Sequence, residues 1–246
     1  MLTAADLSPA ADWTLHKGHV APRHAGKLDA CFADAPMRQF RSSEMLFADG
    51  DLKQHTYKIE SGALLVYKIL RDGVRQIVNL AFPGDYVGLE AGDTHTYEAQ
   101  ALSLTRIRTL STGTLWRRAA EDPALARDIV ETVSRDFSET RSHLLTIGRL
   151  SATGRVATFL LTLVHRNARR KLDPNSLLLP VRRSDIADFL CLSVETVSRS
   201  LTELKAAGAI SLKGWRYIRV HDVDLLERLA DGGSVAGGNG KFLKVA

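Results

Sequence analysis

Residues 184–207 read SDIADFLCLSVETVSRSLTELKAA and form two short amphipathic segments. Ser184 opens the first segment, and serine is a residue type that caps helix N-termini, so we expect a helix from there through Leu190. Ser193 opens the second segment in the same way, and Gly208 would end that second helix because glycine accepts the left-handed conformation found after helices. Two short helices in this order predict a helix-turn-helix.

The second predicted helix has one apolar and one polar face at about 100° per residue. Val197, Leu201 and Leu204 share the apolar face and would pack on the first helix. The candidate DNA-binding residues of this motif are Arg183, Ser184, Glu195, Thr196, Ser198, Arg199 and Thr202. An Arg guanidinium can bond guanine O6 and N7 together, and a Glu carboxylate can accept from cytosine N4 or adenine N6. A helix face that is simply exposed to solvent has a similar composition, so this face alone leaves both interpretations open.

A β-hairpin is predicted after the second helix, over 212–220, with Gly214 at its tip. Lys213 and Arg216 on this wing would contact DNA phosphates, with Arg219 also available. The charge distribution agrees, because residues 151–225 hold twelve Lys and Arg against seven Asp and Glu, whereas the rest of the chain is neutral. A basic C-terminal third suggests a polyanion partner such as double-stranded DNA, and a solvated surface that happens to be basic is the alternative.

Short strand-like runs separated by turn residues occupy 37–113 and predict a sandwich or barrel. The runs are 44–47, 55–60, 63–70, 74–82, 97–102 and 104–110. Asp72-Gly73 between two of these runs is a strong hairpin signal, because glycine accepts a positive φ at no steric cost. Residues 1–36 lack clear periodicity, and we expect an extended or irregular N-terminal arm there.

Helical periodicity begins after Gly113, with one short helix expected at 114–120 and a long one from Pro123 to Gly148. Apolar residues recur along the long helix at steps of three, four and seven: Leu125, Ile129, Val133, Phe137, Leu144 and Ile147. A seam of this length favours a parallel coiled-coil homodimer. Packing of the helix on its own domain is the alternative.

The predicted organisation is an arm (1–36), a β domain (37–113), a helical linker (114–150), a winged helix-turn-helix (151–229) and a Gly-rich flexible tail (230–246). With 45% hydrophobic and 25% charged residues, the composition is that of an ordinary globular protein. No apolar run of membrane-spanning length and no secretory signal is visible, so we expect a cytoplasmic protein without membrane contact. Two cysteines, far apart in sequence, exclude a disulfide framework.

The order of these parts resembles the CRP/FNR superfamily of bacterial regulators along nearly the whole chain. The segment VETVSR (194–199) resembles the recognition-helix signature of the FNR and FixK branch, and Gly62, Gly73 and Pro83-Gly84-Asp85 resemble the turns of its β domain. The resemblance implies an α+β fold: an N-terminal double-stranded β-helix (a β-roll like that of cyclic-nucleotide-binding domains), a long dimerisation helix and a C-terminal winged helix-turn-helix. It further implies a homodimeric activator that reads a TTGAT…ATCAA palindrome and contacts RNA polymerase.

Cofactor expectations follow from the same resemblance. Members that bind cyclic AMP carry an Arg-Ser pair after the Pro-Gly-Asp turn, whereas 88–101 contains no Arg. Oxygen-sensing members use four cysteines for an iron–sulfur cluster, and this chain has two. We therefore expect no cofactor and no metal, as in the FixK type. Haem stays open because His55 and His95 are present.

Two other protein classes remain as alternatives. A cupin-like metalloenzyme with a DNA-binding tail would need a His-x-His pair, whereas the stretch around His95 has one His only. No other catalytic fingerprint is visible, so we do not expect an enzyme. A docking module that uses the β domain without DNA is the second alternative.

Cys191 occupies the turn of the motif, where the resemblance leads us to expect Gly. A positive φ there would cost Cys roughly 1 kcal/mol more than Gly. The thiol also precedes the second helix, whose N-terminal dipole favours a thiolate. We hypothesise a redox-sensitive thiol whose oxidation weakens DNA binding. The alternative is a small buried apolar residue.

Overall fold

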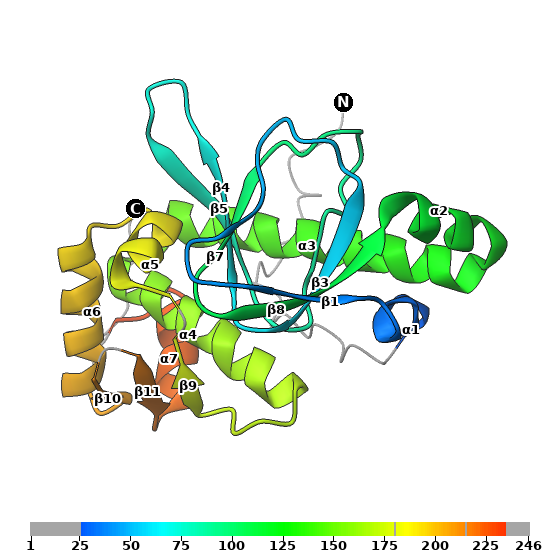
Figure 1. Cartoon of the computed structure of the whole chain (residues 1–246). Coiled ribbons are helices and arrows are strands. Elements are labelled where there is room, and N and C mark those ends of the chain that lie inside the picture. The colour runs from blue at the N-terminus through cyan, green and yellow to red at the C-terminus, as the bar shows by residue number, and fades with distance from the viewer. Residues whose placement is uncertain (1–25, 180, 215, 235–246) are drawn as a thin grey trace, which may run out of the picture.

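The computed structural model of the chain describes residues 26–179, 181–214 and 216–234. The predictions for the first 25 residues of the arm and for most of the Gly-rich tail lie outside the described residues. Eight strands build the N-terminal domain, three strands and four helices build the C-terminal one, and a long helix connects them (Figure 1). Within the described ranges, no helix has the length and apolar character to cross a membrane.

The N-terminal domain is a β-roll of two four-stranded antiparallel sheets with the orders β1-β8-β3-β6 and β2-β7-β4-β5. Its strands are β1 (Met37–Phe40), β2 (Met45–Phe47), β3 (His55–Ser61), β4 (Leu64–Ile69), β5 (Arg75–Ala81), β6 (Tyr86–Val87), β7 (Glu98–Ala101) and β8 (Thr105–Ser111). The hairpin predicted at Asp72-Gly73 is confirmed, since β4 and β5 pair on either side of it and Gly73 has φ +81°.

The interior of the roll follows from the two-residue period of its strands. Tyr57 and Ile59 of β3 face Thr109 and Ile107 of β8 in register, and all four are buried. Gly62 forms the tight turn between β3 and β4 at φ +85°, and a Cβ there would lie 2.4 Å from Thr105 Oγ1. The chain can therefore cross between the two sheets only at a glycine.

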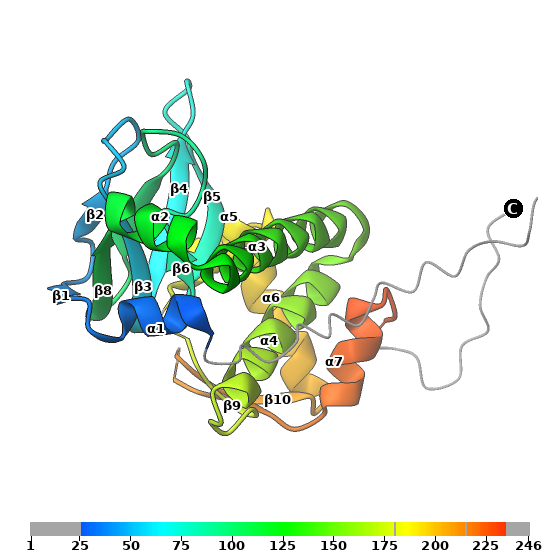
Figure 2. The ribbon, with the colours of Figure 1, turned by 90° about the vertical axis from the view of Figure 1, so that its right-hand side faces the viewer.

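Two short helices close one end of the roll (Figure 2). The predicted short helix is α2 (Thr112–Glu121), and the last part of the arm is also helical, as α1 (Lys27–Ala33). The prediction of an irregular arm is therefore wrong for these residues. Leu28 and Phe32 of α1 belong to a buried cluster that also contains Leu115 of α2, so tertiary packing stabilises a helix too short to form alone.

The long helix α3 (Pro123–Arg149) begins as predicted, with Pro123 in its first turn. The Asp122 carboxylate caps it by accepting from the backbone N–H groups of Ala124 and Leu125. Leu125 and Ile129 are each 2% exposed and belong to the core that α1 and α2 share with the roll. Their assignment to a dimer interface is therefore corrected: the first turns of α3 pack on their own chain.

The C-terminal domain is a winged helix-turn-helix. Its elements are α4 (Ala152–Arg169), β9 (Ser176–Leu178), α5 (Arg183–Leu190), α6 (Val194–Ala206), β10 (Ile210–Lys213), β11 (Tyr217–Val220) and α7 (Val223–Ala230). The three strands form a sheet of order β10-β11-β9, and α7 packs beside α4 (Figure 2). Strand β9 and helix α7 were not predicted from the sequence.

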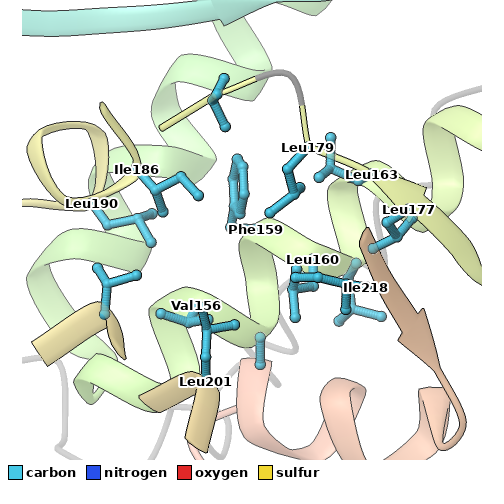
Figure 3. Packing of buried hydrophobic residues seen from close by; sticks show 14 of the residues in the cluster. Val156, Phe159, Leu160, Leu163, Leu177, Leu179, Ile186, Leu190, Leu201 and Ile218 are labelled. Atoms are coloured by element: carbon cyan, nitrogen blue, oxygen red, sulfur yellow. The ribbon is translucent and has the colours of Figure 1, made fainter. Parts of the chain in front are cut away.

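Helix α4 lies at the centre of the core of this domain (Figure 3). Val156 and Leu160 of α4 belong to the same buried cluster as Leu190 of α5 and Leu201 of α6. The same cluster continues into the roll through Tyr67, Ile77, Leu80 and Phe82. The β-roll and the winged helix-turn-helix domain thus share one continuous apolar core.

Candidate nucleic-acid interface

The recognition helix α6 begins where the sequence predicts. The Ser193 hydroxyl accepts from the backbone N–H of Thr196 at 3.0 Å, which confirms Ser193 as the N-cap. Val197, Leu201 and Leu204 are at most 3% exposed and hold α6 against α4 and α5. Capping and one apolar stripe therefore fix which face of α6 points outward.

The outward face of α6 carries a paired anion and cation. The Arg199 guanidinium lies 2.8 Å from the Glu195 carboxylate, one helical turn away, and their side chains are 70% and 74% exposed. In a helix such an exposed pair contributes only about 0.3–0.5 kcal/mol to stability. Its main consequence is that a guanidinium and a carboxylate are available at the surface of the helix. The pair orients a guanidinium fork and a carboxylate in the same direction.

Hydroxyl groups flank this pair. The hydroxyls of Ser198 and Thr202 each donate to a backbone carbonyl one turn earlier, at 2.9 Å. Arg183 of α5 donates to the Ser198 hydroxyl at 3.3 Å, so a cation from the first helix lies beside the outward face. The Thr196 hydroxyl lies 2.8 Å from the Ser193 hydroxyl, which makes Thr196 part of the helix cap as well as a neighbour of this face.

The first helix of the motif, α5, begins two residues earlier than an N-cap at Ser184 would predict. Arg182 is the N-cap residue, and the Asp185 carboxylate accepts its backbone N–H at 3.2 Å. The prediction that Ser184 caps this helix is therefore wrong, because the carboxylate three residues into the helix satisfies the N-cap N–H instead. Ser184 lies half-buried in the first turn of α5.

The turn of the motif is left-handed at Cys191, with φ 53° and ψ 50°. The positive φ that the sequence analysis considers for this turn is present, and Ala187, where the helices cross, is 1% exposed. Cys191 itself is exposed. The alternative of a small buried apolar residue is therefore contradicted, and the thiol is accessible to solvent.

The wing follows α6 as predicted. Strands β10 and β11 pair antiparallel from Ile210↔Val220 to Lys213↔Tyr217, and Gly214 adopts φ +66° at the tip. Lys213 and Arg216 are exposed near that tip. Arg219 forms an ion pair with Asp173, so this third cation of the wing is held by its own chain.

Sequence reasoning missed two side chains of α4 that support the motif. Arg155 donates from Nη1 to the Leu190 carbonyl at 3.1 Å and from Nε to the Leu150 carbonyl, also at 3.1 Å. It therefore joins the end of α3 to the turn of the motif. Thr153 donates to Glu203 of α6 at 2.6 Å. No sequence signal could find these contacts, because their partners are 5 to 50 residues away and include backbone carbonyls.

Metal-ligating residues do not gather anywhere in the described part of the chain: no three His, Cys, Asp or Glu side chains lie close enough to hold an ion. His95 is 2% exposed and stacks on Phe47 with ring centroids 3.5 Å apart. Burial lowers its pKa, and this effect exceeds the opposite effect of Glu90. His55 is half-buried, and its ring lies 6.3 Å from that of Tyr57.

Comparison with known proteins matches both domains. The family model of a Crp-like helix-turn-helix domain matches residues 154–229, and that of a cyclic nucleotide-binding domain matches residues 37–122. The nitrogen fixation regulation protein FixK of Bradyrhizobium diazoefficiens is 38% identical over 173 residues, which cover 70% of this chain and 73% of the relative. FixK of Azorhizobium caulinodans is 37% identical over 190 residues, 77% of this chain and 76% of the relative.

Among solved structures, FixK2 from Bradyrhizobium japonicum superposes with a TM-score of 0.74 at 33% identity. The match covers 79% of this chain and 96% of that structure. The roll, the long helix and the winged helix-turn-helix therefore occur in the same order in both proteins. This chain belongs to the CRP/FNR family and is a FixK-like, DNA-binding transcription regulator.

Proposed function

We propose that the protein is a homodimeric activator of transcription that reads a TTGAT…ATCAA-type palindrome with helix α6. The exposed Glu195–Arg199 pair carries this proposal. Its carboxylate can accept from cytosine N4 or adenine N6, and its guanidinium can bond both acceptors of guanine. Ser198 is placed to contact a base edge or a phosphate next to them.

The outward stripe of α3 supports the homodimer. From Val130 to Ile147, positions repeat at steps of three and four, and the stripe consists of Val130, Val133, Phe137, Thr140, Leu144 and Ile147. Val130, Phe137 and Leu144 are 56–64% exposed, an arrangement that costs free energy in water unless a partner covers it. A second α3 with the same 3-4 spacing would cover it in a parallel coiled coil. The two recognition helices would then reach successive major grooves about 34 Å apart.

A regulator without cofactor and without catalytic activity fits the side chains of the roll. The buried cation Lys53 donates to the backbone carbonyls of Glu90 and Ala91 at 2.8 and 3.1 Å, so its charge is directed at its own chain. An imidazole ligand for haem would need an accessible ring, whereas His95 is enclosed and stacked on Phe47. We place the protein in the cytoplasm beside its DNA and RNA polymerase partners.

Selection of binding sites from random duplexes with the purified protein tests this proposal. The selected site should be a two-fold palindrome with TTGAT-type half-sites. Arg199→Ala should weaken binding to that site by about 10- to 100-fold, the loss of one bidentate base contact, and leave binding to random duplex nearly unchanged. The matched control is Lys205→Ala, which removes a cation from the last turn of the same helix. An Arg199→Ala protein that binds the palindrome as tightly as wild type, or that loses affinity for the palindrome and for random duplex by the same factor, would refute the proposed readout.

A further inference from the structure

An arginine of the β-roll reaches into the helix-turn-helix. Arg75 begins strand β5, and its Nη2 lies 3.0 Å from the Asp185 carboxylate and 2.8 Å from that of Asp188, both on α5. The side chain of Asp185 is 6% exposed and that of Arg75 is 34% exposed. The Arg75 guanidinium also lies 5.8 Å from the centre of the Tyr67 ring. A half-buried ion triad thus joins the two domains through residues 110 and 113 positions apart in sequence.

Asp185 connects this triad to the start of α5. One of its oxygens accepts the Arg182 N–H that begins the helix, and the other accepts from Arg75. The next residue along, Arg183, donates to Ser198 on the recognition helix. A continuous set of polar contacts therefore runs from β5, through the first turn of α5, to the outward face of α6.

We propose that Arg75 is a positioning residue for DNA reading: its pairing with Asp185 and Asp188 lets the β-roll brace the first helix of the motif in the orientation that α6 needs. Buried ion pairs contribute little net stability but strongly penalise arrangements that separate them, which suits an orienting role. Burial by itself would lower the pKa of Arg75, but the two carboxylates more than compensate and raise it.

The opposite role, in which this contact restrains the motif in a DNA-incompetent position, fits the geometry less well. With the triad formed, Glu195 and Arg199 remain more than two-thirds exposed. The contact holds the face of α5 that turns toward β5, whereas α6 lies at the outer side of the molecule (Figure 1). The β-roll thus touches the motif from behind without covering the residues that read DNA.

The test uses the full-length protein and the palindrome that wild-type protein selects, so that it does not depend on the exact half-site. Arg75→Gln removes the charge and keeps a polar side chain. Asp188→Asn weakens the triad at its more exposed carboxylate, and Arg75→Lys keeps one cation. Arg71→Gln is the matched control, because Arg71 is exposed at the tip of the same hairpin. Asp185 is left unchanged because it also caps α5.

Arg75→Gln should weaken binding to the selected palindrome by about tenfold, within the range of coupled polar networks, and leave random-duplex binding unchanged. Asp188→Asn should lose less palindrome affinity than Arg75→Gln, and Arg75→Lys should retain part of the wild-type affinity. The Arg75→Gln/Asp188→Asn double variant should bind the palindrome no more weakly than Arg75→Gln alone. Hydrogen exchange should accelerate in the first turn of α5 in Arg75→Gln and stay unchanged in Arg71→Gln.

Three results would overturn the proposal. Unchanged palindrome affinity would mean that the triad does not position the motif. Increased affinity would mean that it restrains the motif. Equal losses on both duplexes, in proportion to the unfolded fraction measured by circular dichroism, would mean a merely structural contact. Should Arg75→Gln fail to fold, Asp188→Asn decides by the same criteria.

Discussion

The His143 ring of α3 stacks on the Phe189 ring of α5 with centroids 4.0 Å apart, and His143 Nε2 lies 3.0 Å from the Phe189 backbone carbonyl. A carbonyl only accepts, so Nε2 must carry the hydrogen. The contact therefore ties the long helix to the first helix of the DNA-binding motif through an imidazole that donates from Nε2.

Stability should decrease in mild acid because the His143 ring is partly buried. Burial lowers the pKa of His143 from its ordinary value of 6.5, partly opposed by the bond to Phe189, and burial also lowers the pKa of His95. The unfolded chain thus binds protons that the folded chain refuses as the pH falls below about 6.5, and unfolding becomes easier there. Urea unfolding from pH 7.5 to 5 measures this slope. His143→Phe should reduce it, and a slope that this variant leaves unchanged would contradict the assignment.

The exposed stripe of α3 predicts the dimer contact. Phe137→Glu or Leu144→Glu places a charge where a second helix would pack, at positions 56% and 64% exposed in one chain. These variants should fold as monomers and bind the palindrome much more weakly, as measured by analytical ultracentrifugation and by DNA titration.

Leu125→Ala is the contrasting variant on the same helix. Because Leu125 is 2% exposed within its own chain, it should lose about 2–5 kcal/mol of stability and keep the dimer dissociation constant of wild type at temperatures where it is folded. If Leu125→Ala were monomeric and Phe137→Glu dimeric, the face with Leu125 would be the dimer interface and the face with Phe137 would not.

The two faces of α3 show where sequence reasoning ends. Periodicity identifies a long amphipathic helix, but Leu125 and Ile129 follow one apolar stripe and Val130 to Ile147 follow another. The first stripe packs on α1 and α2, and the second faces solvent. Hydrophobic periodicity shows that a helix face is covered, but it does not show whether the same chain or a second chain covers it. The sequence-based prediction therefore combined the two stripes into one dimer seam.

The recognition helix was predictable for the opposite reason. Its cap, its apolar stripe and its end are all encoded within residues 193–208, and each signal is local. Strand β9 and helix α1 are short and owe their formation to distant neighbours. The hydrogen bonds of Arg75 and Arg155 join residues up to 113 positions apart. Nothing in the sequence around an arginine indicates so distant a partner.

Cys191 should limit the stability of the motif. Its φ of 53° lies in the left-handed region that favours glycine. Cys191→Gly should therefore raise the free energy of unfolding by about 1 kcal/mol, with the backbone unchanged. Thermal unfolding measures the difference, and Cys31→Ser controls for loss of a thiol elsewhere. A Cys191→Gly protein less stable than wild type would show that the sulfur makes a favourable contact that outweighs the strain.

The exposed thiol of Cys191 should also make DNA binding sensitive to oxidation. A sulfenic or sulfinic acid in this turn would add a polar or negative group directly before α6 and near the DNA phosphates. Peroxide should therefore weaken palindrome binding by wild type and leave Cys191→Ser binding intact, whereas Cys31→Ser should respond like wild type. Equal loss of affinity in Cys191→Ser and wild type would exclude this residue as the site of oxidation.

The wing should contribute affinity without sequence preference. Lys213 and Arg216 lie exposed near the hairpin tip, beside the helix that would enter the major groove, and cations there would displace counterions from phosphates. Lys213→Ala and Arg216→Ala should each reduce the slope of log K against log salt by about one and weaken palindrome and random duplex alike. Arg219→Ala is the contrasting variant, because Asp173 already pairs with that cation. A wing variant that changes the selected sequence at the same salt slope would instead assign base readout to the wing.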